Sequence, residues 1–277
     1  MTRFETSPIL NQEEEERNMS EILRYDKVEI KYGDAVAVSD ISFSVREGEI
    51  LGIVGESGSG KSTIIKAAMG LLGEGAGVSS GDIIYDGKSL LNLSKKEQLE
   101  INGPNLGMIF QFAGSSFCPV RKIGTQLYEA MRAHSNISKE EFKERVSELL
   151  RKLGFNDDTR ILESYPNELS GGMQQRVGVV CAMLLNPKVL LADEPTSAMD
   201  VTIQKQAVEE MVRVRDTFNT SIIIVTHNIG VVNVMADNVL VLKDGRIVEM
   251  GATKDIINNP KEEYTKKLMD AVPRLKR

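Results

Sequence analysis

The sequence predicts an α/β fold with a mainly parallel sheet, a β-rich N-terminal part and an inserted block of helices. Three observations predict it. Before residue 50, two segments alternate apolar and polar side chains, as half-buried strands do. Within the block at about 112–170, the apolar residues of the segment 138–154 follow a helical period. After residue 170, short apolar strands alternate with helical segments, which is typical of a parallel sheet.

The first part of the chain contains four segments with strand character. The first two alternate apolar and polar residues, the third is continuously apolar and leads into a glycine-rich loop, and the fourth ends in a turn. The glycine-rich loop is followed by a predicted helix, KSTIIKAAMGLL. The four strand segments are KVEIKYG (27–33), ISFSVREG (41–48), EILGIVG (49–55) and GDIIYDGKSL (81–90).

The block at about 112–170 is expected to be an inserted helical subdomain. Its segment SKEEFKERVSELLRKLG starts with Ser138 and Glu141, which have the spacing of a capping box, and Gly154 is a stop signal. One apolar stripe runs along this predicted helix. The stripe consists of Phe142, Val146, Leu149, Leu150 and Leu153.

The remainder alternates helices and strands, and it ends in a short helical tail at 253–277. We expect helices from Gly172 and Thr202, a short helix after residue 227, and a strand turn at Asp244-Gly245. The predicted strands are KVLLAD (188–193), SIIIVTH (221–227) and NVLVLKDGRIVEMG (238–251). At the other end, residues 1–22 read as a flexible acidic arm because Glu13 to Glu16 form a charge run.

Composition limits the classes of function. A net charge of −6 argues against broad nucleic-acid binding, which needs a basic face. Cys118 and Cys181 lie far apart without metal-type spacing, which fits a reducing compartment. The N-terminal stretch has no apolar signal-peptide core, and no apolar run reaches the roughly 18 residues of a membrane span. We therefore expect a chain that does not cross a bilayer by itself.

The loop GESGSGKST matches the P-loop pattern G-x-x-x-x-G-K-S. It follows a strand and opens a helix, so its backbone N–H groups and the helix N-terminus can surround a phosphate. Lys61 supplies a charge for the β- and γ-phosphates, and the Ser62 hydroxyl suits Mg²⁺. The competing interpretation is a glycine turn without a ligand. The predicted ATP-binding residues of the loop are Gly55, Glu56, Ser57, Gly58, Ser59, Gly60, Lys61, Ser62 and Thr63.

Further polar or aromatic residues stand at predicted strand ends. Because ligands of parallel α/β sheets bind beyond the carboxyl ends of the strands, these side chains are candidates for the same crevice. Asp193 suits the Mg²⁺ shell, and Glu194 is placed to polarise an attacking water. His227 is a candidate for the γ-phosphate, and Gln111 for Mg²⁺ or the water. Tyr32 is a candidate for stacking on a purine. Taken singly, each is also compatible with a cap or packing role.

Together these residues resemble the ATP-binding subunit of an ABC transporter over 28 to about 274. The most specific element is the signature LSGGMQQR at 169–176, and a D-loop, SAMD, lies at 197–200. The resemblance implies a P-loop NTPase (RecA-like) core with a mainly parallel sheet, an N-terminal antiparallel β subdomain and an inserted α-helical subdomain. It places the ATPase domain at 23–252. It also implies hydrolysis of ATP to ADP and phosphate, with Mg²⁺ as cofactor.

The resemblance implies a role for each matching residue. Lys61 and the loop backbone would bind phosphates, while Ser62 and Gln111 would serve Mg²⁺ together with Asp193. Glu194 would be the general base and His227 the γ-phosphate sensor, so that the catalytic set is Glu194, His227, Gln111 and Lys61. Tyr32 stands where the family stacks adenine.

The signature is expected to act on ATP held by a partner subunit. The head-to-tail dimer of the family would bring Ser170 and Gly172 to the partner's γ-phosphate, and Ser197 and Asp200 would lie at the dimer seam. The expected trans-acting residues are Leu169, Ser170, Gly171, Gly172, Met173 and Gln174.

A finer resemblance is to the peptide/nickel (oligopeptide/dipeptide) importer branch. Three segments carry it, although Phe112-Ala113, Cys118 and Met199 depart from the branch pattern. The branch implies a second, different ATPase subunit, two transmembrane permease subunits and an extracytoplasmic substrate-binding protein. It implies a peripheral position at the cytoplasmic face of the membrane. The segments are MIFQ…SSFCPVRKIGTQL, DEPTSAMDVTIQKQ and NNPKEEYTKKLMDAVPRL.

Several alternatives remain open at this stage. The cargo could be a peptide, nickel or a metal chelate, and the dimer could be homomeric or heteromeric. Another transport cargo, a non-transport ABC ATPase and a different P-loop enzyme such as a kinase are the competing functions. The short insert disfavours the second of these, and the intact signature disfavours the third.

Overall fold

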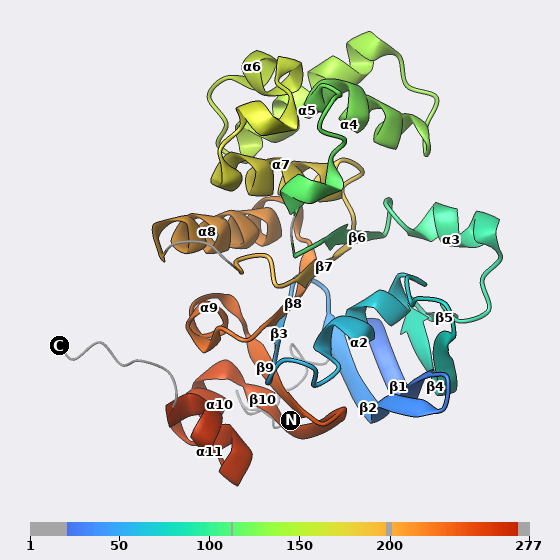
Figure 1. Ribbon diagram of the computed structural model, residues 1–277, viewed down its shortest axis with the longest axis vertical. Helices are drawn as coiled ribbons and strands as arrows, with labels where there is room; N and C mark the ends of the chain where they lie inside the picture. The colour runs from blue at the N-terminus through green and yellow to red at the C-terminus, as the bar shows by residue number, and fades with distance from the viewer. Residues whose placement is uncertain (1–20, 112, 198–200, 271–277) are drawn as a thin grey trace, which may run out of the picture.

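The computed structural model of the chain describes residues 21–111, 113–197 and 201–270. Expectations for the arm before residue 21, for Phe112, Met199 and Asp200, and for the tail after residue 270 lie outside this range. Figure 1 shows two sheets in the lower half of the molecule and a separate group of helices above them. This is the α/β arrangement predicted from the sequence, with an N-terminal antiparallel sheet and a helical block.

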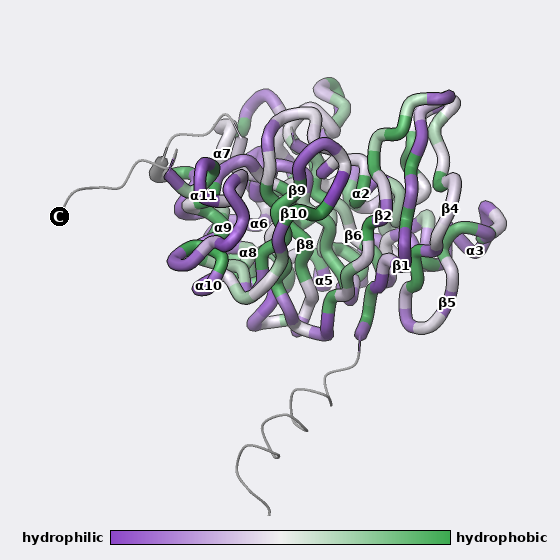
Figure 2. The backbone as a smooth tube through the Cα atoms, turned by 90° about the horizontal axis from the view of Figure 1, so that it is seen from below, coloured by the Kyte–Doolittle hydropathy of each residue, from purple (hydrophilic) through white to green (hydrophobic). Residues whose placement is uncertain are grey.

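The larger sheet has six strands in the order β10-β9-β3-β8-β7-β6, and all pairs are parallel except β10 with β9. Every residue of β3, β7 and β8 is buried, which explains their continuously apolar sequences. Figure 2 shows hydrophobic backbone around β8 in the interior, with hydrophilic segments around it. The strands are β3 (Ile50–Val54), β6 (Leu106–Ile109), β7 (Val189–Asp193), β8 (Ser221–Thr226), β9 (Asn238–Lys243) and β10 (Arg246–Ala252).

The smaller sheet is antiparallel, with the order β2-β1-β4-β5. Its first strand begins at Glu21 and buries Ile22, so it includes the last two residues assigned to the flexible arm. A bulge between Tyr25 and Val28 shifts the alternation, which hid the first half of the strand from the period-two pattern. The strands are β1 (Glu21–Tyr32), β2 (Ala35–Arg46), β4 (Ala76–Tyr85) and β5 (Lys88–Ser89).

The helical block consists of α4 (Ile123–Arg132), α5 (Lys139–Lys152) and α6 (Asp158–Glu163). The Ser138/Glu141 capping box forms as predicted, with both reciprocal hydrogen bonds present. All five residues of the predicted stripe are buried in one core cluster. The helical reading of this segment is therefore confirmed.

Other helices flank the six-stranded sheet. One helix of the chain, α3, was not predicted. Helix α3 buries no side chain, so it lacks the apolar stripe that reveals a helix, although its Ser94/Glu97 capping box is present in the sequence. Within the described residues, no helix combines the length and the apolar character that crossing a membrane would require. These elements are α2 (Lys61–Ala68), α3 (Lys95–Ile101), α7 (Gly171–Met183), α8 (Val201–Phe218), α9 (Ile229–Met235), α10 (Thr253–Asn258) and α11 (Glu263–Asp270), with short 3₁₀ turns at η1 (Ala113–Ser116) and η2 (Pro166–Glu168).

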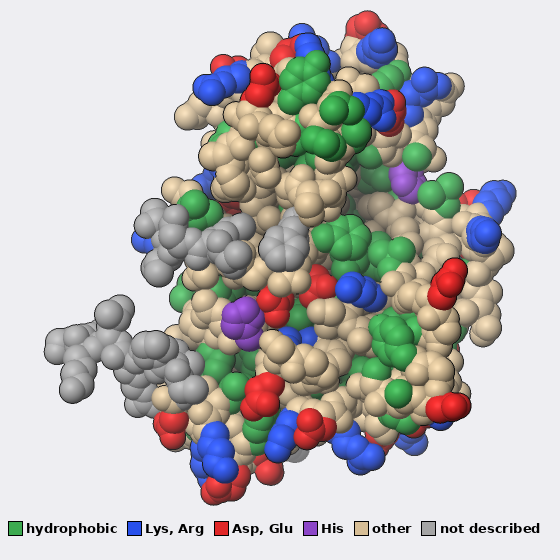
Figure 3. Space-filling view, in the orientation of Figure 1, with side chains coloured by type: hydrophobic (Ala, Val, Ile, Leu, Met, Phe, Trp, Pro, Cys, Tyr) green, Lys and Arg blue, Asp and Glu red, His purple; other side chains and the backbone are tan. Residues whose placement is uncertain are grey.

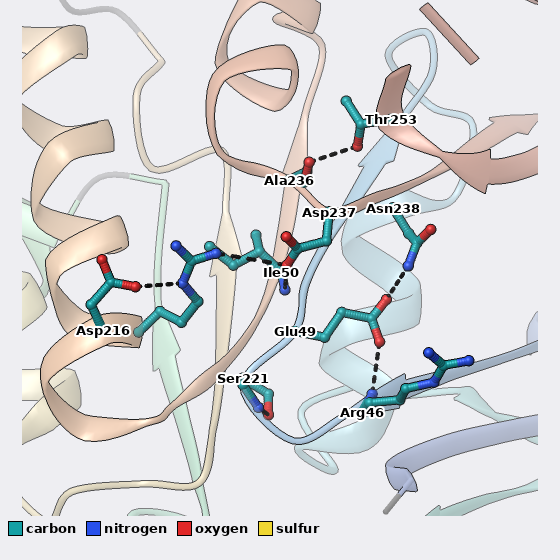
Figure 4. A network of polar contacts seen from close by, with 11 residues as sticks. Arg46, Glu49, Ile50, Asp216, Ser221, Ala236, Asp237, Asn238 and Thr253 are labelled. Carbon is teal, nitrogen blue, oxygen red and sulfur yellow. Dashed lines mark hydrogen bonds and ion pairs between the residues drawn. The ribbon is translucent and has the colours of Figure 1, made fainter. Parts of the chain in front are cut away.

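A polar network fixes the start of β3 between its neighbours (Figure 4). The Glu49 carboxylate accepts hydrogen bonds from the Arg46 N–H at 2.9 Å and from Asn238 Nδ2 at 2.7 Å. Asp237 Oδ2 accepts the Ile50 N–H at 2.8 Å. These bonds satisfy buried backbone groups and set the height of β3 relative to β9, and hence the position of the loop at its far end.

Truncation of Leu150 tests the packing of the helical block. Leu150 is fully buried in α5, so Leu150→Ala is expected to lower the free energy of unfolding by about 2–5 kcal/mol. Leu99 is 50% exposed on α3, and Leu99→Ala is expected to change this free energy by less than about 0.5 kcal/mol. Chemical denaturation of both variants provides the measurement, and equal effects would contradict the assigned core.

Candidate active site

A cavity of about 600 Å³ lies at the carboxyl ends of the parallel strands. Its walls come from the start of β2, the loop between β3 and α2, the residues that follow β6, β7 and β8, and the β9–β10 turn. In Figure 3, acidic and basic side chains and a histidine gather near the middle of this face. The lining residues are Val36, Ala37, Ser57, Gly58, Gly60, Lys61, Ser62, Thr63, Gln111, Glu194, His227, Asp244 and Gly245.

At two positions, Gly55 and Gly60, the P-loop approaches its neighbours so closely that only glycine fits. Gly60 has φ +100°, and a Cβ there would lie 2.8 Å from Val38 Cγ2. At Gly55 a Cβ would lie 2.1 Å from the Leu242 carbonyl oxygen. The Ser59 hydroxyl is buried and finds no hydrogen-bond partner among the described residues. The loop is thus a tight backbone cradle beside the first turn of α2, which is the geometry that binds phosphate.

Lys61 is the buried cation of this cradle, with 5% of its surface exposed. Its Nζ donates hydrogen bonds to the Gly55 carbonyl at 2.9 Å and the Glu56 carbonyl at 2.8 Å. Burial lowers the pKa of Lys61, while the carboxylates of Glu194 and Asp193 oppose this effect. An incoming anion would favour the charged form further, so the site is suited to a polyanionic ligand.

Asp193 and Ser62 form a pair of oxygen ligands beside the loop. The Ser62 hydroxyl donates to Asp193 Oδ1 at 2.5 Å, and Lys66 Nζ lies 3.7 Å from Asp193 Oδ2. Carboxylate and hydroxyl oxygens are the donors that Mg²⁺ accepts together with phosphate oxygens. The residues present therefore fit this metal.

Glu194 is held between two other strand ends. Gln111 Nε2 donates to its Oε2 at 3.2 Å, and His227 Nδ1 lies 3.2 Å from its Oε1. Its backbone has a φ of +44°, and its N–H bonds to the Val225 carbonyl at 2.8 Å. The structure thus brings together three residues that lie far apart in the sequence, with 116 positions between Gln111 and His227.

The structure adds residues that sequence reasoning did not assign to the site. Val36, Ala37, Asp244 and Gly245 all line the cavity. Asp244-Gly245 was recognised only as a turn, yet the Gly245 N–H bonds to the Ser59 carbonyl at 3.1 Å. This contact exists because β9 pairs with β3, which no local pattern reveals.

Tyr32 is a predicted ATP-binding residue that does not line this cavity, and Gly55, Glu56, Ser59 and Asp193 are likewise absent from its lining. Tyr32 is 42% exposed at the end of β1. Tyr32 pairs with Ala35 across the hairpin, and the next residue, Val36, does line the cavity, so Tyr32 stands at its rim.

The signature residues form a second exposed helix start, on α7. Ser170 caps the helix by accepting the Met173 N–H at 3.4 Å, and a Cβ on Gly171 would meet nothing within 4 Å. The Gln174 side chain bonds to the carbonyls of Pro166 and Leu169. Within the described chain, none of the six signature residues lines the P-loop cavity. Of the predicted seam residues, Ser197 donates its N–H to the Glu194 carbonyl at 3.1 Å, whereas Asp200 lies outside the described residues.

Arg176 connects the signature helix to its surroundings and was not singled out from the sequence. Its guanidinium pairs with Glu210 of α8, donates to the Leu153 carbonyl at 2.9 Å and lies 4.2 Å from the centre of the Phe155 ring. Burial raises the pKa of Glu210, and Arg176 opposes this shift. The pair fixes α7 against both α8 and the end of α5.

Comparison with protein families gives two matches. Residues 38–197 match the family "ABC transporter", and residues 248–277 match "Oligopeptide/dipeptide transporter, C-terminal region". The chain is 39% identical over 236 residues to the metal-staphylopine import system ATP-binding protein CntD of Staphylococcus aureus, covering 85% of this chain and 87% of that protein. It is 43% identical over 244 residues to the oligopeptide transport ATP-binding protein OppD of Bacillus subtilis, covering 88% and 68% respectively.

Two solved structures share the fold. The chain cbiO1 of Clostridium perfringens, part of the ABC transporter complex cbiONQ, gives a TM-score of 0.76 at 27% identity, covering 86% of this chain and 91% of that chain. The ATP-binding cassette MJ0796, solved as a dimer in a post-hydrolysis state bound to ADP and Pi, gives 0.72 at 26% identity, covering 84% and 99% respectively.

Crowding at Gly60 provides a test of the cradle. Gly60→Ala is expected to lower the free energy of unfolding by about 1–3 kcal/mol more than Gly58→Ala. Both positions have positive φ, but a Cβ at Gly58 meets nothing within 4 Å, so the difference isolates crowding from backbone strain. Chemical denaturation measures both variants. Equal losses would show that the loop is not packed against Val38 as the structure has it.

Proposed function

The chain belongs to the ABC transporter family of ATP-binding proteins, and from this premise we propose that it powers an importer of peptides or metal chelates. Membership makes it an ATPase. The observation that carries the proposed mechanism is the convergence of Gln111 and His227 on the Glu194 carboxylate, beside the P-loop cavity.

We propose that the P-loop binds the phosphates of ATP. Lys61 would pair with the β- and γ-phosphates, and the backbone N–H groups of 55–63 would surround them. Ser62, Asp193 and the Gln111 amide oxygen would hold Mg²⁺, which supplies charge neutralisation for the phosphates when bound. Tyr32 would stack on adenine at the rim of the cavity. The tight cradle, the buried cation and the paired oxygen ligands described above support these assignments.

In the proposed reaction, a water oxygen attacks the γ-phosphorus and the bond from phosphorus to the β–γ bridging oxygen breaks. Glu194 accepts the proton of the water, and the products are ADP and phosphate. Gln111 orients the carboxylate from one side, while His227 holds it from the other and contacts the γ-phosphate. A base fixed on both sides needs little reorganisation during the reaction.

We further propose that two ATPase subunits form a head-to-tail dimer. Ser170 and Gly172 would contact the γ-phosphate on the partner's P-loop, with Ser197 and Asp200 at the seam. The separation of α7 from the cavity supports this arrangement, because none of the six signature residues of the described chain lines the P-loop cavity. The preferred partner is a different sister subunit.

Within the transporter, we propose that residues 23–252 form the ATPase domain, with 112–170 as its helical insert and 253–277 as a C-terminal tail. Two permease subunits and an extracytoplasmic binding protein would complete the complex, with this chain peripheral at the cytoplasmic face. The C-terminal match and the printed names of OppD and CntD support import of a peptide or a metal chelate. Nickel is a further proposed cargo of the same importer. Another transported cargo is the alternative.

Replacement of the base tests the hydrolysis mechanism. Glu194→Gln is expected to lower the ATP turnover rate by about 10²–10⁴-fold, because an amide cannot accept the proton, and to leave ATP affinity within a few-fold. Glu74→Gln changes an exposed carboxylate in a loop and serves as the matched control. Phosphate release and equilibrium ATP binding provide the two readouts. Full turnover of Glu194→Gln would remove Glu194 from the role of base.

The partner choice has its own test. With ATP, Glu194→Gln is expected to remain monomeric alone and to form a stable dimer with the sister ATPase subunit that co-purifies with the permeases. Light scattering of the separate and mixed proteins measures this. A stable homodimer that turns over ATP at the rate of the complete transporter would favour the homomeric alternative.

A further inference from the structure

The C-terminal helix α11 packs on the end of the molecule opposite the helical block (Figure 1). It lies within residues 248–277, the region shared with oligopeptide/dipeptide transporters. Met269 is 5% exposed in a core cluster with β3, β9 and α9, and Leu268 packs against the same cluster. The helix is thus part of the folded domain rather than a loose appendage.

Glu249 of β10 anchors the start of this helix. Its carboxylate accepts the N–H of Lys261 at 2.9 Å and the N–H of Glu262 at 3.1 Å. Burial raises the pKa of Glu249, but the Lys261 N–H, the Thr265 side chain and the Glu262 N–H together outweigh burial and leave the pKa below its ordinary value. The anchor fixes where the next residues of the chain, including Tyr264, meet the sheet.

Tyr264 reaches from α11 to the P-loop. Its hydroxyl oxygen accepts the backbone N–H of Glu56 at 3.3 Å, across 208 positions of sequence. Lys243 Nζ lies 5.0 Å from the centre of the tyrosine ring, which holds the ring from the sheet side. A helix outside the nucleotide motifs therefore touches the second residue of the phosphate-binding loop.

The bonded N–H belongs to the peptide between Gly55 and Glu56. The carbonyl of that same peptide, the Gly55 oxygen, accepts a hydrogen bond from Lys61 Nζ at 2.9 Å. No cis peptide occurs in the described chain, so the N–H and C=O of this planar unit point in opposite directions. Tyr264 and Lys61 consequently hold the two ends of one rigid group, and a tilt of the peptide at one end moves the other.

We propose that Tyr264 is a positioning residue for nucleotide binding, which sets the tilt of the Gly55–Glu56 peptide and thereby the place of the Lys61 ammonium. The inference rests on the proposed phosphate-binding role of the P-loop. The C-terminal region would thereby act at the ATP site. With Tyr264 bonded, Lys61 is aligned before the nucleotide binds, so the free energy of binding is not reduced by the cost of ordering Lys61.

The test compares Tyr264→Phe with Tyr128→Phe. Tyr264→Phe removes one hydroxyl and keeps the ring over Lys243. Tyr128 also bonds a backbone group, the Ile137 carbonyl at 3.4 Å, but in the helical block. The dissociation constant of ADP with Mg²⁺, measured by calorimetry, is expected to rise about three- to tenfold in Tyr264→Phe and to stay within twofold of wild type in Tyr128→Phe. The ATP KM should rise by the same factor while kcat stays within twofold.

Glu249→Ala tests the route through α11. Because its effect would act by displacing Tyr264, this change should weaken ADP binding in the wild-type background and have no further effect in Tyr264→Phe. If Glu249→Ala weakened ADP binding by the same factor in both backgrounds, its effect would not act through Tyr264. An unchanged ADP affinity in Tyr264→Phe would overturn the proposal itself. If the wild-type chain itself failed to bind ADP, the proposed P-loop function would fail instead, so the two failures are distinguishable.

Discussion

The parallel pairing of β3 with β8, and of β8 with β7, is the constraint on which the rest of the structure depends. Val54 pairs with Thr226, and Asp193 pairs with Val225, so these strands end at nearly the same height. The next residues along each strand are the start of the P-loop, His227 and Glu194. Strand pairing alone therefore brings side chains from distant parts of the chain together at the carboxyl ends of the strands, where parallel sheets bind their ligands.

The same arrangement separates two kinds of loop that look alike in sequence. The P-loop leads from the core strand β3 into the sheet-packed helix α2, where a buried cation and paired oxygens surround the cavity. The signature loop leads from the helical block into α7, where its Ser170 cap is exposed and the Arg176–Glu210 pair fixes the helix from behind. One loop lines a cavity within the chain, and the other begins its helix at an exposed surface.

Where local sequence signals and tertiary packing agreed, the fold could be predicted well. The continuously apolar strands β3, β7 and β8 and the capped helix α5 were read correctly, because burial on both faces or on one stripe leaves a clear pattern. The bulge in β1 broke the period of two, and α3 has no buried stripe, so both escaped detection in part or in full. The start of β1 was therefore placed too late, because a bulge in the backbone, rather than the composition, decides where its alternation breaks.

The sequence by itself determined the local chemistry: a glycine loop before a helix, acids and a histidine after apolar strands, and a second glycine-lined helix start. Only the tertiary structure decided which groups touch. It placed Gln111 and His227 on either side of Glu194, brought the Asp244-Gly245 turn over the P-loop, left Tyr32 at the rim, and joined Tyr264 to the Glu56 N–H. The physical reason is that motifs and caps are encoded by neighbours in sequence. Contacts between residues 83 or 208 positions apart arise instead from strand order and helix packing, which depend on the whole chain.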